Sequence, residues 1–156
     1  MEPTRRPPTA DVPDLTTVVT DVLGDLAFMV TDDETPDVGA GTVWMQADIN
    51  YYGPISGTLR CWCTRHFATQ LAANLLGIEP EEGEAVVAAE DALREFMNVL
   101  CGQLVTTWHG TEHVFNLSIP GVCECMEAPP PADPAAAFCR LSIDGEPLLC
   151  THRRVE

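Results

Sequence analysis

Basic side chains are scarce in this sequence. Eight Lys and Arg residues stand against 24 Asp and Glu residues, which gives a formal net charge of −16 and a pI of about 4.3. A nucleic-acid surface needs clustered Lys and Arg to neutralise phosphates, and an anionic membrane surface needs a similar basic cluster. Five of the eight lie in the N-terminal tail or the last predicted strands: Arg5, Arg6, Arg140, Arg153 and Arg154. We therefore expect neither nucleic acid nor a membrane as partner.

A long apolar segment is also missing. No run approaches the roughly 18 residues that a membrane span requires. At the N-terminus, Arg5 and Arg6 are followed by prolines instead of the apolar region of a secretory signal, so we expect a cytoplasmic protein. Residues 1–13 are rich in Pro, Thr and charge, which predicts a disordered N-terminal tail. Residues 14–156 are long enough for one domain with its own core.

The seven cysteines form an odd number, and two pairs have the spacing C-x-C. They are Cys61 and Cys63, Cys123 and Cys125, and the separate Cys101, Cys139 and Cys150. In a strand, the C-x-C spacing puts both sulfurs on one face. The simplest interpretation is reduced thiols that act as small apolar side chains inside a sheet. The alternative is a metal site in which the two pairs converge, with His66 or His113 in support. Zinc sites more often use C-x₂₋₄-C spacing, so we expect no metal site.

Apolar periodicity and turn residues predict an α+β protein. The predicted helices cover residues 15–30, 65–76 and 85–108. The predicted strands cover residues 42–51, 55–63, 113–119, 122–126, 138–143 and 147–152. Asp14 and Thr64 are the expected N-caps of the first two helices, and Asp144-Gly145 favours a type I′ hairpin turn. Hairpins dominate, so we expect a mainly antiparallel sheet packed with a long amphipathic helix and two further helices.

The helix predicted over residues 85–108 has two distinct faces. Its apolar face gathers Val86, Ala89, Leu93, Phe96, Met97, Leu100 and Leu104. On the opposite face, Asp91, Glu95, Asn98 and Gly102 follow one another at i, i+4, i+7 and i+11, within roughly 60° of rotation. We refer to these four residues as the polar stripe. Asn and Gly are poor helix formers, so the stripe needs a reason other than helix stability.

The polar stripe resembles the signature of the CheC/CheX/FliY phosphatases, which remove phosphate from the chemotaxis response regulator CheY. Residues 97–102 resemble the N-x-x-x-G helix of the family, and residues 115–120 resemble its F-x-x-S-x-P strand. The likeness covers nearly all of residues 14–152. A single stripe is similar to the CheX branch, because CheC-type members usually carry two. The resemblance implies a CheC-like fold and a CheX-like phosphatase domain over residues 14–156.

The resemblance also implies roles for the four stripe residues. Asn98 would orient the water that attacks an aspartyl phosphate, as a glutamine does in small GTPases. Glu95 would hold a lysine of the response regulator and fix the docking geometry. Asp91 would support the surroundings of Glu95, and Gly102 would permit close approach of the partner. The expected partner is a phosphorylated CheY-like response regulator that carries Mg²⁺ itself, with no cofactor in this chain. The family further implies a homodimer.

Simpler explanations exist for each residue alone. Glu95 could be a solvated side chain, Asn98 a surface amide, and Gly102 a packing contact with the first helix. Together they must explain an ordered stripe opposite an apolar face, so we favour the functional interpretation. One alternative is a non-catalytic module of the same fold that binds a receiver domain, or dimerises, in another signalling pathway. A third hypothesis is a metal- or redox-responsive protein built on the C-x-C pairs.

Overall fold

The computed structural model describes residues 13–36, 41–127, 129 and 136–155, so the predicted tail over residues 1–13 lies outside the described residues except for Pro13. The helices are α1 (Leu15–Ala27), α2 (Arg65–Leu76), α3 (Gly83–Val87) and α4 (Ala89–His109). The strands are β1 (Trp44–Tyr52), β2 (Ser56–Thr64), β3 (Asn116–Leu117), β4 (Gly121–Cys125), β5 (Ala137–Ile143) and β6 (Glu146–Val155). The α+β class and the order of the main elements are as the sequence predicts.

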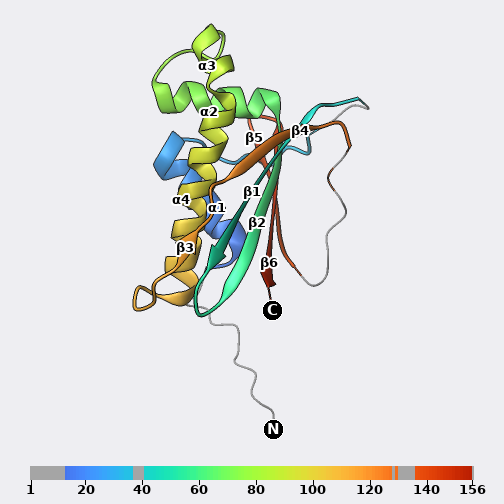
Figure 1. Cartoon of the computed structure of the whole chain (residues 1–156). Helices are drawn as coiled ribbons and strands as arrows, with labels where there is room; N and C mark the ends of the chain where they lie inside the picture. The colour runs from blue at the N-terminus through green and yellow to red at the C-terminus, as the bar shows by residue number, and fades with distance from the viewer. Residues whose placement is uncertain (1–12, 37–40, 128, 130–135, 156) are drawn as a thin grey trace.

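The strands form one antiparallel sheet with the order β3-β1-β2-β6-β5, and β4 pairs with β1 beside β3. Helices α1, α2 and α4 pack on one face of this sheet, α3 lies beyond its end next to α2, and α4 runs along the sheet from α3 to the β3 end (Figure 1). Helix α1 packs beside α4 and β5, while α2 packs against α4. Among the described residues, no helix combines the length and the hydropathy that a membrane crossing requires.

The main core fills the space between the helices and the sheet. Its largest fully buried side chains include Tyr51, Phe67, Phe96, Met97 and Leu100, which come from β1, α2 and α4. A second, smaller apolar cluster lies on the other face of the sheet, where Trp44, Trp62 and Leu149 pack together. The two clusters follow from side-chain alternation, because neighbouring residues of a strand point to opposite faces.

Local sequence signals set several boundaries. Asp14 caps α1 by accepting a hydrogen bond from Thr17 N at 2.9 Å, and Thr64 Oγ1 accepts one from Phe67 N at 3.1 Å to cap α2. At the β5–β6 hairpin, Asp144 and Gly145 have φ values of 54° and 77°, as a type I′ turn requires. These predictions are confirmed.

The helix predicted over residues 85–108 is wrong at its beginning. The chain turns at Ala88, whose φ and ψ are −86° and 1°, so α3 ends at Val87 and α4 starts at Ala89. Val86, predicted on the apolar face, is 48 % exposed because it precedes this turn. The remaining predicted apolar positions of α4 are buried.

Two further boundaries differ from the prediction. Helix α1 ends at Ala27 and not near residue 30, because Phe28 adopts a left-handed conformation with φ of 58°. The strand predicted over residues 113–119 shortens to Asn116–Leu117. Beyond it, Ser118 continues to bind β1, since Ser118 N donates to Asn50 O and Asn50 N donates to Ser118 Oγ. The predicted F-x-x-S-x-P segment is therefore held to β1 through its serine.

Candidate functional site

Helix α4 carries the polar stripe on its solvent side. Its apolar residues are buried against the sheet, α1 and α2, which fixes the rotation of the helix about its axis. As a result Asp91, Glu95 and Asn98 are exposed, and Gly102 is partly exposed. The structure thus brings all four predicted site residues to one surface.

Glu95 and Asn98 are free to meet a partner. Neither side chain makes a hydrogen bond or an ion pair with any other residue that the structure describes. Both sit on a rigid helix that is anchored at its far end, where Trp108 Nε1 donates to Pro13 O at 2.8 Å. A carboxylate and an amide one turn apart, on a fixed backbone, are suited to position a cation and a water molecule.

Asp91 has an internal partner. Its Oδ1 accepts a hydrogen bond from Nη1 of Arg94 at 2.8 Å, and the Nη2 atom of Arg94 lies 3.7 Å from Glu90 Oε1. Arg94 was not among the residues that the sequence pattern singles out. The i,i+3 and i,i+4 spacing from Asp91 and Glu90 is the signal that identifies it.

Gly102 does not pack against another helix. A Cβ built on this residue would meet no other described residue within 4 Å beyond the adjacent backbone of its own helix, which contradicts the simpler explanation of a contact with α1. Gly102 instead borders a hollow of about 280 Å³ between the end of α4, the following loop and β3. The lining includes Thr106, Phe115 and Leu117 beside Gly102. The polar stripe therefore ends at an open depression.

Helix α1 contributes a second acidic strip next to α4. Asp21 and Asp25 line a hollow of about 290 Å³ together with Val99 and Gln103 of α4. Both aspartates are exposed. The surface formed by α1 and α4 therefore carries Asp21 and Asp25 on α1 in addition to Asp91 and Glu95 on α4.

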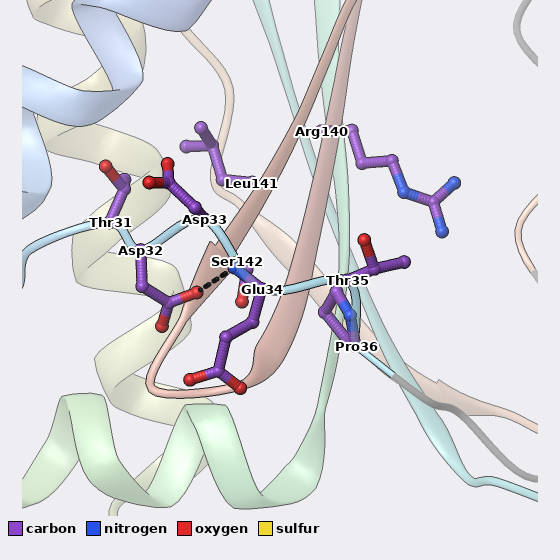
Figure 2. A pocket seen from close by; sticks show the side chains of 9 residues that line it. All are labelled: Thr31, Asp32, Asp33, Glu34, Thr35, Pro36, Arg140, Leu141 and Ser142. Carbon is purple, nitrogen blue, oxygen red and sulfur yellow. Dashed lines mark hydrogen bonds between the residues drawn. The ribbon is translucent and has the colours of Figure 1, made fainter.

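A third hollow lies at the β5 edge of the sheet and not at the stripe (Figure 2). The carboxylate of Asp32 in this hollow already accepts two backbone hydrogen bonds, from Glu34 N at 3.0 Å and from Gly145 N at 3.1 Å. Figure 2 shows that the carboxylates of Asp33 and Glu34 point in opposite directions. The loop that begins at Asp32 is therefore tied to the β5–β6 hairpin without forming a convergent set of carboxylates.

The two C-x-C pairs do not converge. Cys61 is aligned through Ala47 with Val122, whereas Cys123 is aligned through Gln46 with Trp62, so the two pairs face opposite sides of the sheet. Among the described residues, no group of three or more His, Cys, Asp or Glu side chains is placed to hold a metal ion. The four-sulfur metal hypothesis is wrong for this geometry.

Burial of five of the seven cysteines also argues against thiol chemistry. Cys61, Cys63, Cys101, Cys139 and Cys150 are buried, as expected for small apolar side chains. Burial raises the pKa of Cys101 and of Cys139 to about 12, so both are neutral thiols at pH 7. Thiolate, not thiol, is the reactive nucleophile.

One buried polar cluster was not predicted. The Tyr51 hydroxyl and His152 Nε2 are 2.8 Å apart in a hydrogen bond, and the ring of Trp108 packs edge-on against His152. Burial, together with the charge of the neighbouring His109, lowers the pKa of His152 to about 4. The cluster lies within the core, and the strand pattern gives no sign of it because His152 alternates like an apolar residue.

Comparison with known proteins identifies the family. The family described as "Chemotaxis phosphatase CheX" matches residues 45–133, more than half of the chain. A search of curated protein sequences finds no match.

Solved structures share the fold. The crystal structure of the CheX–CheY–BeF3–Mg²⁺ complex from Borrelia burgdorferi has 18% identity and a TM-score of 0.65, covering 91% of this chain and 96% of that one. Chemotaxis protein CheX from Vibrio vulnificus has 16% identity and a TM-score of 0.68, covering 94% and 97%. FliY from Thermotoga maritima has 12% identity and a TM-score of 0.56, covering 90% and 84%. With its CheC-like fold and this family match, the chain belongs to the CheX family of chemotaxis phosphatases.

Proposed function

We propose that this protein hydrolyses the aspartyl phosphate of a CheY-type response regulator, with Glu95 and Asn98 as its catalytic residues. The observation that carries the proposal is the pair itself: two exposed side chains one turn apart on α4, without partners among the residues that the structure describes, in a member of a phosphatase family. The complex of a CheX protein with CheY from Borrelia burgdorferi supports the choice of partner.

The chemistry explains why so few residues suffice. An aspartyl phosphate is an acyl phosphate and is already labile, and the receiver domain supplies its own Mg²⁺ and lysine for charge neutralisation. What the receiver domain does not supply is a water molecule held in line with the leaving oxygen. The uncharged amide of Asn98 orients that water without repelling the phosphoryl oxygens, and Glu95 holds the lysine of the receiver.

The other two stripe residues belong to the docking surface in this proposal. Asp91 supports the docking surface next to Glu95, and the receiver backbone approaches over Gly102, where the helix offers open space. We also propose a homodimer and a cytoplasmic location. The β5 edge suits a dimer contact, because within the described residues its outer side pairs only at Ser142, with Asp32.

The test is dephosphorylation of receiver domains from the same genome, charged with a small-molecule phosphodonor. Wild type, Glu95→Ala and Asn98→Ala are compared, with Gln103→Ala as control, since it removes an exposed amide from the same helix outside the stripe. Wild type and the control should accelerate the loss of phosphate, and both stripe variants should lose at least about 10²-fold in rate.

Two results would change the conclusion. Acceleration that survives Asn98→Ala would contradict the role of the amide. A wild-type protein that binds the charged receiver domain without accelerating hydrolysis would replace the phosphatase by a non-catalytic binding module.

A further inference from the structure

Arg94 forms ion pairs with two acidic residues of its own helix, α4. Its guanidinium bridges Asp91, at 2.8 Å, and Glu90, at 3.7 Å, and it lies one residue before Glu95. The two carboxylates come from the preceding turn of α4, so they hold the guanidinium at the border of the polar stripe. The side chain of Arg94 remains 37 % exposed and can still meet a partner.

The charges around Arg94 are almost all negative. Helices α1, α3 and α4 contain no other Lys or Arg. In α2, the only Lys or Arg is Arg65, the first residue of the helix, and it is paired with Glu124 of β4. Asp21 and Asp25 of α1 add their carboxylates beside α4. Arg94 is therefore the one arginine or lysine that the described helices place near Asn98.

We propose that Arg94 is a positioning residue that guides a phosphorylated receiver domain onto the polar stripe. This inference rests on the proposed function. A phosphoryl group and the acidic pocket around it are repelled by a protein with a net charge of −16. A guanidinium presents a planar fork that matches phosphate and carboxylate oxygens, and its charge acts over about 10 Å at 0.1 M salt. The ion pairs with Glu90 and Asp91 hold the guanidinium in one orientation before the partner binds.

The competing explanation is an ordinary surface ion pair. Such pairs contribute about 0–1 kcal/mol to stability and have no effect on a partner. That explanation predicts a small change in Tm for an Arg94 variant and an unchanged affinity for the receiver domain.

The experiment measures the affinity for a receiver domain activated with beryllium fluoride, together with KM and kcat for the phosphorylated domain. Arg94→Gln is compared with Arg60→Gln, which makes the same change in net charge at an exposed arginine of β2 that pairs with Asp48 on the face of the sheet opposite the helices. Arg94→Lys tests whether the positive charge alone restores binding.

We expect Arg94→Gln to weaken binding and raise KM about 5-fold or more at low salt, with kcat within about 2-fold, and the difference should shrink as salt screens the charge. Arg60→Gln should change KM less than about 2-fold, and Arg94→Lys should recover at least half of the lost affinity. Equal effects of the two Gln variants, or an effect of Arg94→Gln on Tm alone, would overturn the inference. Absence of binding by the wild type would instead overturn the proposed function, and this inference with it.

Discussion

Gly102 gives the sharpest test among single residues, because its structural and functional effects have opposite signs. A glycine inside a helix costs about 1 kcal/mol relative to alanine, and a Cβ at this position would clash with none of the described residues. Gly102→Ala should therefore raise Tm by about 2–4 °C. It should also slow dephosphorylation, because the added methyl lies where the receiver domain approaches. Thermal unfolding and the phosphatase assay measure the two effects.

Gly24→Ala is the matched control for that substitution. Gly24 lies inside α1, where an added Cβ would make only an ordinary contact with Met29 O at 3.9 Å. This variant should gain similar stability and keep full activity. Equal activity of both variants would remove Gly102 from the docking surface.

His152 predicts how stability depends on pH. Its pKa falls from 6.5 to about 4 on folding, so in this range the unfolded chain binds the proton more tightly. The stabilising effect is complete above about pH 6.5 and is lost progressively as the pH falls toward 4, by about 3 kcal/mol.

Urea unfolding between pH 7.5 and 4.5 measures that loss. His152→Gln keeps a polar partner for the Tyr51 hydroxyl but does not titrate, so its stability should fall less over this range. Parallel curves for wild type and variant would show that carboxylates, and not His152, cause the acid sensitivity.

At the scale of elements, Thr64 joins a strand, a helix and a hairpin. Its hydroxyl caps α2 by accepting from Phe67 N, and it donates to Glu146 Oε1 at 2.6 Å. Thr64→Ala should lower the free energy of unfolding by about 1–2 kcal/mol, because both bonds are lost. Thr64→Ser retains the hydroxyl and should cost less. Urea unfolding distinguishes them, and equal losses would assign the effect to the methyl group of threonine.

The boundaries of the helices and strands show which structural features can be predicted from the sequence. Caps and the Asp144-Gly145 turn depend on neighbouring residues, so the sequence predicts them at the correct positions. The turn at Ala88 has no Gly or Pro to announce it, and the helical pattern simply continues through it. Strand β3 is short because Ser118 takes over the contact with Asn50 through its side chain, which strand propensity does not encode.

At the scale of the whole molecule, net charge governs the approach of the partner. With a net charge of −16, the chain should associate with an acidic receiver domain faster as salt rises from about 20 to about 300 mM, because screening weakens the repulsion. Stopped-flow association rates measure this effect. A rate that falls with salt would indicate that local attraction outweighs the global charge.

The polar stripe follows from the sequence because it lies on one helix, where a period of 3.6 residues fixes which side chains share a face. Its surroundings do not follow from the sequence. Strand β6 lies between β2 and β5, and this order places α1 next to α4 and β5. Asp21 and Asp25 thus come to lie beside Val99 and Gln103 of α4 through tertiary structure alone. The sequence pattern likewise omits Arg94.

The seven cysteines differ in exposure, so their rates of modification can report how often each element opens. Cys123 is exposed and Cys125 partly exposed on β4, while the buried thiols sit in β2, α4, β5 and β6. A thiol-modifying reagent will therefore label β4 at once and the others only when their segments open. The successive labelling times, read by mass spectrometry, convert into opening free energies for each element without any engineered probe.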